Sequence, residues 1–190
     1  AAIAELEIVT ASTSTNAIDM FGDVTLLDSQ APELLLNATA GGIADSGAAT
    51  LTVTTLGLQA GGGEIATSGN RLLVDTGNDT IAATATGSIF ITEADGATVG
   101  SVTVDGVTVT GITTTGAGGS IDLVVTNGTL TVNEQIAATG AGNDVRIDVN
   151  GVGEDDDIVL ASNGNISASD QVELRASRDI TQATSTITVA

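Results

Sequence analysis

The 190-residue sequence contains no cysteine, histidine, tryptophan or tyrosine, and Phe21 and Phe90 are its only aromatic residues. Without cysteine the chain can form no disulfide bond, thiol nucleophile or thiolate metal site. Proline occurs once, at position 32, and no long polar linker interrupts the sequence. We therefore expect residues 1–190 to form a single domain.

Positive charge is also scarce, since four arginines and no lysine stand against 24 acidic residues, which gives a net charge of −20. A field of this sign repels nucleic acid and anionic lipid, so we exclude both as direct partners. No apolar run approaches the length of about 18 residues that a membrane-spanning helix needs, and we expect no membrane insertion. Because there is no initiator methionine, we expect a processed product or a piece of a longer chain.

Apolar residues make up 42% of the sequence, and they recur with a period of two in short runs such as SVTVDG at 101–106 and TLTVN at 129–133. This alternation is typical of strands with one buried face. Turn dipeptides separate the runs and therefore predict frequent reversals or corners. They are Asp95-Gly96, Asp105-Gly106, Asn127-Gly128, Asn150-Gly151 and Asn163-Gly164.

The alternating runs repeat along the chain, and each can be marked by the first apolar residue that follows its turn. These markers are Val24, Leu51, Leu72, Ile89, Ile121, Val145 and Val172. The distance from the first to the last is 148 residues over six intervals, a mean of 24.7, with single intervals from 17 to 32. A recurrence of this length indicates stacked structural repeats.

Two all-β architectures produce short strands with frequent turns. A parallel β-helix repeats two or three strands per coil about every 20–30 residues, whereas a β-sandwich joins strands that do not repeat. The recurrence favours a right-handed parallel β-helix of about seven or eight coils, forming one β-helical domain over residues 1–190. The alternative is a β-sandwich filament subunit that exchanges strands with its neighbours.

Three phrases carry a resemblance to a known family: GSIFITEADGATVGSVTVDG, GTLTVNEQIAATGAGNDVRIDVNG and DDIVLASNGNISASDQVELRASRDI. They resemble the repeats of filamentous haemagglutinin-type exoproteins and large bacterial surface adhesins over about residues 22–180. The resemblance implies a right-handed β-helix that is exported to the bacterial cell surface. It lies in composition and rhythm, so it assigns no functional residue.

The densest charged segment is the glycine-flanked run Glu154, Asp155, Asp156 and Asp157. Adjacent carboxylates are hard oxygen ligands, so this run predicts a calcium site. The competing interpretation is a solvated acidic turn that prevents sideways aggregation. We expect no cofactor, and calcium at this run is the alternative.

Candidates for catalysis are few, and we expect no enzymatic activity. Polysaccharide-active enzymes need clustered carboxylates with basic partners and aromatic platforms for sugar rings. The nearest approach is Arg146 close in sequence to Asp144 and Asp148, which a surface ion pair explains, while Asp122 is expected to be an exposed acid. Recurrent Thr-x-Thr pairs also occur on ice-binding faces, but β-propensity accounts for them and the irregular spacing opposes a flat array.

Both ends of the sequence are strand-like and largely apolar, with AAIAELEIV at the beginning and STITVA at the end. The terminal strands of a β-helix leave backbone groups unpaired, so they are templates for a further strand. We therefore predict a partner interface at these ends. Its residues are Ile3, Leu6, Ile8, Ile187 and Val189.

Together these observations predict a structural segment of a secreted, extracellular or cell-surface bacterial fibre or adhesin that assembles end to end. Its partner would be a second copy, in a head-to-tail homopolymer, or the flanking repeats of the same chain. The alternative is a non-catalytic, calcium-dependent or carbohydrate-binding surface module on the same fold. An ice-binding protein and a polysaccharide-active enzyme rank below both.

Overall fold

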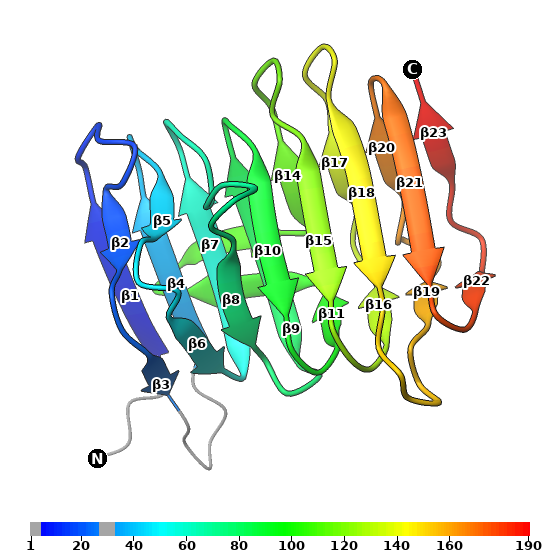
Figure 1. Cartoon of the computed structure of the whole chain (residues 1–190). Helices are drawn as coiled ribbons and strands as arrows, with labels where there is room; N and C mark the ends of the chain where they lie inside the picture. The colour runs from blue at the N-terminus through cyan, green and yellow to red at the C-terminus, as the bar shows by residue number, and fades with distance from the viewer. Residues whose placement is uncertain (1–4, 27–32) are drawn as a thin grey trace.

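The computed structural model describes residues 5–26 and 33–190, and this part of the chain contains 23 β-strands and no helix. Most strands pair in parallel with the strands of the coils before and after. The chain descends through the strands nearest the viewer in Figure 1, crosses below and rises behind, so the coil is right-handed. The predicted parallel β-helix is thus confirmed, as a solenoid of about seven turns.

A seven-stranded sheet, here called the front sheet, forms one face of the solenoid. Its strands are β3 (Val24–Leu26), β6 (Thr50–Val53), β8 (Leu72–Asp75), β10 (Ile89–Glu93), β15 (Ile121–Val125), β18 (Asp144–Val149) and β21 (Gln171–Ala176). Next to the N-terminal end of this sheet, β2 (Ile18–Met20) pairs with β5 (Ile43–Asp45).

A 12-stranded sheet bends to form the other two faces. Its back run consists of β1 (Glu5–Thr10), β4 (Glu33–Ala38), β7 (Thr55–Ala60), β9 (Thr80–Ala85), β14 (Ile112–Thr114), β17 (Ile136–Ala138), β20 (Ile166–Ala168) and β23 (Ile187–Val189). Its lower run consists of β11 (Ala97–Val99), β16 (Leu130–Val132), β19 (Ile158–Leu160) and β22 (Ile180–Gln182).

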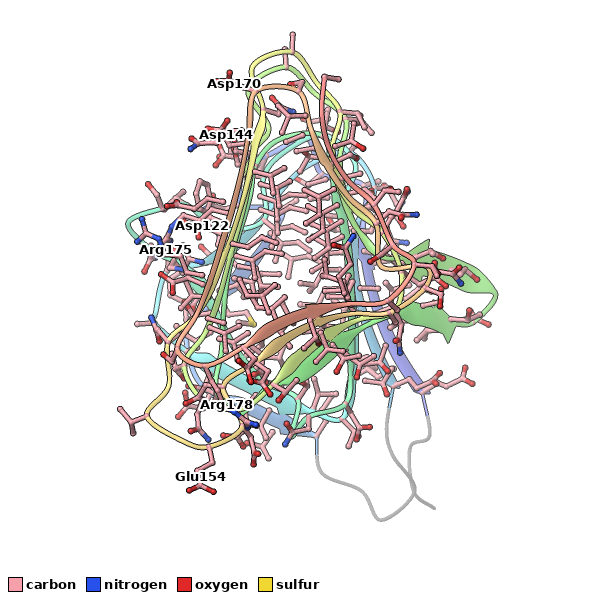
Figure 2. All side chains as sticks on the ribbon, turned by 90° about the vertical axis from the view of Figure 1, so that its right-hand side faces the viewer. Asp122, Asp144, Glu154, Asp170, Arg175 and Arg178 are labelled. Atoms are coloured by element: carbon pink, nitrogen blue, oxygen red, sulfur yellow. The ribbon has the colours of Figure 1, made fainter. Side chains whose placement is uncertain are left out.

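The three faces enclose a triangular core, which Figure 2 shows along the solenoid axis. Inward positions carry Leu, Ile, Val and Ala, with Met20 as an additional member at the N-terminal end. Each large aliphatic side chain buried in this way stabilises the fold by about 1.5–3 kcal/mol. The predicted alternation is therefore the feature that builds the core, because every second residue of a strand faces inward.

Parallel pairing stacks equivalent inward residues into columns. One of these columns, here called the back column, follows the strands of the back run. Its members are Ile8, Leu36, Leu58, Ala83, Ile112, Ile136, Ile166 and Ile187. With about 4.8 Å between paired strands, these eight layers span about 34 Å.

The longest interval between markers has a simple structural cause. Strands β12 (Ser101–Val104) and β13 (Val107–Thr110) form an antiparallel hairpin between β11 and β14. At its tip Asp105 and Gly106 have φ values of 47° and 81°. Two successive positive φ angles define the type I′ turn, for which Asp-Gly is a preferred sequence. The hairpin is an insertion that leaves the coil, and β14 then returns to the register of β9.

The hairpin lies against the outside of the back run rather than extending into solvent. Val102, Val104 and Val109 are 1–2% exposed and form a second apolar cluster with Leu35 and Ala82. Leu35 and Ala82 are outward residues of β4 and β9, and Gly57 lies between them in register. A side chain at that glycine would lie 3.3 Å from Val102, so the hairpin approaches the strand closely here.

The marker residues are only partly equivalent in space. Ile89, Ile121, Val145 and Val172 do occupy one column of the front sheet. Leu72, however, pairs with Ile91. The earlier markers also belong elsewhere, because Leu51 aligns with Val74 and Val24 aligns with Leu51. Sequence spacing identified the repeat correctly but assigned the early coils to the wrong column, because their turns differ in length.

Candidate functional site

The two ends of the solenoid differ sharply from its interior. Along the back column the six inner residues are 0–3% exposed, whereas Ile8 is 43% exposed and Ile187 is 44% exposed. These two side chains point in the same direction as the buried ones, but no described residue covers them from the next layer. The ends therefore present core positions to solvent.

The N-terminal end contains an open apolar groove of about 330 Å³, which Leu6, Ile8 and Leu36 line together with parts of β2 and β3. Leu6 and Ile8, both predicted as interface residues, thus lie together on this surface. The third predicted residue, Ile3, lies outside the described residues. Phe21, which was not predicted as an interface residue, borders the same groove and is 75% exposed.

At the C-terminal end, the predicted interface residues Ile187 and Val189 both belong to β23 and face the core direction. Their partners one coil earlier, Ile166 and Ala168, are 0% and 4% exposed, whereas Val189 is 54% exposed. Ile180 of β22 has the same relation to buried Ile158 and is 47% exposed. Ile180 was missed because its strand, ITQ, is too short to show alternation.

The acidic run is brought to one corner, but its four carboxylates do not converge. Glu154 and Asp155 are exposed, Asp156 is buried, and the Asp157 carboxylate accepts a hydrogen bond from the Asp179 amide at 3.0 Å. Asp157 also lies 3.6 Å from Arg178. In the described part of the chain, no three acidic side chains form a group that could hold a metal ion. A four-carboxylate calcium site is therefore not formed in this geometry, and calcium binding itself remains a prediction.

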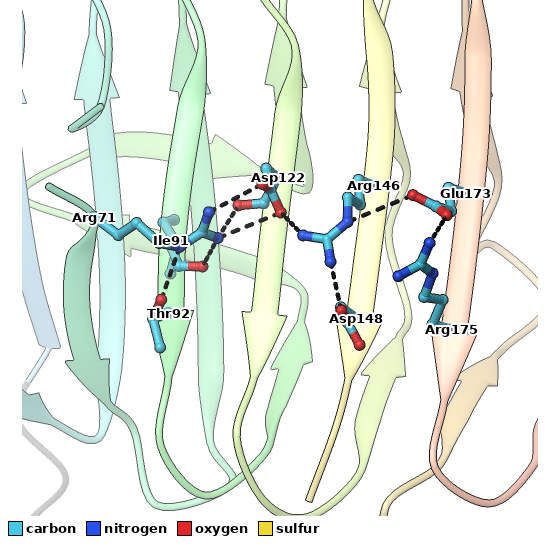
Figure 3. Close-up of polar contacts among 8 residues, drawn as sticks. All are labelled: Arg71, Ile91, Thr92, Asp122, Arg146, Asp148, Glu173 and Arg175. Atoms are coloured by element: carbon cyan, nitrogen blue, oxygen red, sulfur yellow. Dashed lines mark hydrogen bonds and ion pairs between the residues drawn. The ribbon is translucent and has the colours of Figure 1, made fainter. Parts of the chain in front are cut away.

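Three of the four arginines lie on the outer surface of the front sheet, where they form a ladder of ion pairs (Figure 3). Asp122 lies between Arg71 and Arg146, with N–O distances of 3.0 Å to each. Arg146 also contacts Asp148 at 2.5 Å and Glu173 at 3.5 Å, as expected of a surface ion pair. Asp144 is not among its partners, and Asp122, whose side chain is 22% exposed, is less exposed than predicted.

The ladder results from the register of the coils. Asp122, Arg146 and Glu173 are paired positions of β15, β18 and β21, so their charges alternate along the axis. Arg175 completes the series with a 2.5 Å contact to Glu173. Such pairs at a surface contribute little energy each, but opposite charges stabilise this pairing over a shifted one.

Glu93 is an acidic residue inside the core. It occupies an inward position of β10, between Val74 and Val125, and is 0% exposed. Its carboxylate accepts hydrogen bonds from the amides of Thr76 at 3.0 Å, Asp95 at 2.9 Å and Gly96 at 2.5 Å. Burial nevertheless raises the pKa of Glu93 above its ordinary value, because the low-dielectric core disfavours the charge.

No protein-family model, curated protein or solved structure matches this sequence. The described residues contain no helix that is long and apolar enough to cross a membrane. Evidence about function therefore comes from the geometry of the described residues. Its most distinctive feature is the pair of solenoid ends with exposed core positions.

Proposed function

We propose that this chain is a structural, non-catalytic segment of an extracellular bacterial fibre or adhesin, and that its coils join end to end with further coils through β-strand pairing. The observation that carries the proposal is the back column, which is buried in its interior and exposed at both ends. An added coil at either end would bury these side chains as the interior coils already do.

The two ends are compatible because they belong to the same columns. Ile8 and Ile187 are the terminal members of the back column, so placing β1 on β23 continues it without a shift. In that register Ile187 pairs with Ile8, Thr188 with Val9, and Val189 with Thr10. A contact between unlike ends does not close on itself, so it extends into a filament.

The extracellular location rests on composition and on the resemblance to surface adhesin repeats. The chain is strongly acidic and has neither lysine nor cysteine. A high charge of one sign keeps long rods soluble and disfavours sideways bundling at low salt. Structural function rests on the solenoid itself, whose residues are devoted to core positions, turns and the contacts between coils.

Engineered cysteines provide a direct test, because the natural sequence has none. Thr188→Cys in one preparation and Val9→Cys in another should form a mixed disulfide under mild oxidation. Paired residues lie about 4.8 Å apart, within the range of Cα distances that a disulfide allows. The matched control is Glu7→Cys, which is two residues out of register and about 8 Å away.

Efficient cross-linking at position 9 but not at position 7 would support the proposed register. Equal cross-linking at both positions, or none at either, would contradict it. Light scattering then identifies the source of the partner coil. If the intact chain grows into filaments at high concentration, a second copy supplies it; if the chain stays monomeric, end-to-end joining of copies is refuted and only flanking repeats of a longer chain remain.

A further inference from the structure

The turns between the front sheet and the lower run form an edge of the solenoid, here called the acidic corner. Figure 2 shows Glu154 and Arg178 at this corner. An open polar pocket of about 390 Å³ lies there and spans the turns of successive coils. Its lining residues are Asn78, Asp95, Asn127, Gly128, Thr129 and the loop segment 153–156.

Asp156 is the residue of this pocket whose environment is incomplete. Its side chain is fully buried, and its Oδ1 accepts a hydrogen bond from the Gly128 amide of the preceding coil at 2.8 Å. Its Oδ2 is buried as well but has no hydrogen-bond partner. A buried carboxylate oxygen without a partner is costly, so this atom points to a ligand that would satisfy it.

The glycine of the loop above it leaves room for such a ligand. Apart from Gly153 itself and its two chain neighbours, the three heavy atoms nearest to the position that a Cβ of Gly153 would occupy are all side-chain oxygens. They are Asn127 Oδ1 at 3.4 Å, Asp156 Oδ2 at 3.5 Å and Asp156 Oδ1 at 3.7 Å. Oxygen atoms of Asn127 and Asp156, which belong to two successive coils, thus face the same small space beside Gly153.

The charge of the pocket favours a cation. Four carboxylates line it, from Asp95, Glu154, Asp155 and Asp156, and no basic residue does. Arg178 does not line the pocket; it contacts the backbone carbonyl of Glu154 and lies 3.6 Å from Asp157 and 3.5 Å from Asp179. Its charge is thus paired with two acids, Asp157 and Asp179, that do not line the pocket.

We infer that the pocket binds one calcium ion between Asp156 and Asn127. The donors are hard oxygens, which calcium accepts at about 2.3–2.6 Å in flexible geometry, with water completing the shell. Magnesium requires a rigid octahedral set and releases water reluctantly, so it fits the site less well.

This site differs from the predicted run of four adjacent acids. Asp157 is not part of it, and Glu154 and Asp155 contribute charge at its rim. The central ligands come from different coils, so a bound ion would connect the β15–β16 turn to the β18–β19 turn. The inference goes beyond a structural role, because it makes the cohesion of the coils dependent on calcium.

Differential scanning calorimetry tests this inference. The intact chain should gain about 3–5 °C in melting temperature when calcium exceeds the dissociation constant about 10-fold. Magnesium at the same concentration, with ionic strength matched by sodium chloride, should give a clearly smaller shift. Isothermal titration calorimetry should show one calcium ion per chain.

Asp156→Asn keeps the shape of the side chain but removes the charge and the free oxygen, so it should abolish the calcium shift. Asn127→Ala changes an exposed residue and should weaken binding at least 10-fold with an unaltered circular dichroism spectrum. Asp170→Asn is the matched control, because it removes one exposed acid at a different corner (Figure 2) and should leave the shift intact.

Three results would overturn the inference: no calcium binding by the intact chain, a magnesium shift equal to the calcium shift, or a calcium shift that survives in both Asp156→Asn and Asn127→Ala. Equal losses in these variants and in Asp170→Asn would also overturn it, because they would assign the effect to general screening of the acidic surface. Should Asp156→Asn fail to fold, Asn127→Ala decides the question alone.

Discussion

Neighbouring coils are held together by different outer contacts on the two sides of this solenoid. On the back of the N-terminal half, valines of the β12–β13 hairpin cover outward apolar residues of β4 and β9. On the front of the C-terminal half, the outer contacts are ion pairs between Asp122, Arg146 and Glu173. The valine contacts of the hairpin exclude water, whereas the ion pairs of the front sheet form in its presence.

The outward residues explain why only one side has a cover. Leu35 would expose a large apolar side chain without the hairpin, whereas the outward residues of the later back-run strands include Thr113, Ala137 and Ser167. A polar or small surface needs no cover, and charges can be added to it in register. Buried apolar area should therefore contribute more stability than charge pairing, and the two should respond oppositely to salt.

The largest effect is expected from Val102→Asp. This side chain is 1% exposed between the hairpin and the back run, so the variant buries an unpaired charge. We expect a loss of about 3–5 kcal/mol in the free energy of unfolding, measured by urea denaturation. Thr103→Asp, on the solvent side of the same strand, should cost less than about 0.5 kcal/mol. Comparable losses would show that the hairpin does not pack through its valine face.

Arg71→Met should have the next largest effect. The Arg71 guanidinium donates to the backbone carbonyls of Ile91 and Asp122 at 2.6 Å each and lies 6.0 Å from the centre of the Phe90 ring. Since this side chain is 18% exposed, its loss leaves half-buried acceptors and should cost about 1–2 kcal/mol. A change in the urea midpoint too small to measure would place Arg71 in solvent rather than in these contacts.

Arg146→Met should cost less than about 1 kcal/mol at low salt, because the side chain is 34% exposed although it contacts three acids. The difference from the natural chain should nearly vanish at about 1 M sodium chloride, where the Debye length falls to roughly 3 Å. The loss caused by Val102→Asp should persist there. A salt-independent Arg146 effect would assign its role to packing of the methylene groups instead.

The smallest effect is expected at Glu93, in the coil that carries the hairpin, and it concerns how the melting temperature depends on pH. Its raised pKa means that the folded chain binds this proton more tightly than the unfolded chain does. The stability it contributes is present at acid pH and is lost as pH rises from the ordinary value of 4.5 through the folded pKa. Melting temperature plotted against pH should thus fall less steeply in Glu93→Gln than in the natural chain. Identical slopes would show that Glu93 titrates normally.

The core and the ends could be predicted from the sequence because both depend on the period of two. Alternation selected Ile121 and Val145 as inward residues, and both are 0–1% exposed. It also placed Ile8 and Ile187 at the two ends. A feature that depends only on local alternation can be predicted from the residue types and their positions in the sequence.

Other features of the fold also have a local signal in the sequence, although they were not predicted. Three consecutive leucines in ELLLNA indicate a strand that is buried on both faces, and Asp105-Gly106 between alternating valines indicates a hairpin. Glu93 follows Ile89 and Ile91 at the same period, which places it inside. The pocket at Asp156 gave no such signal, because it joins residues 29 positions apart whose approach depends on the lengths of two loops.

The base of the hairpin determines where additional residues can be inserted into such a chain. The Gly111 amide donates a hydrogen bond to the Gly100 carbonyl at 2.8 Å. This bond joins the two residues that flank the ten-residue hairpin, so the coil is continuous across the base of the hairpin. Additional sequence can therefore enter at this corner without altering a single strand register. A peptide inserted at Asp105-Gly106 would be displayed on the side of the rod at a fixed height along its axis. New segments could therefore be attached at defined positions along the solenoid axis.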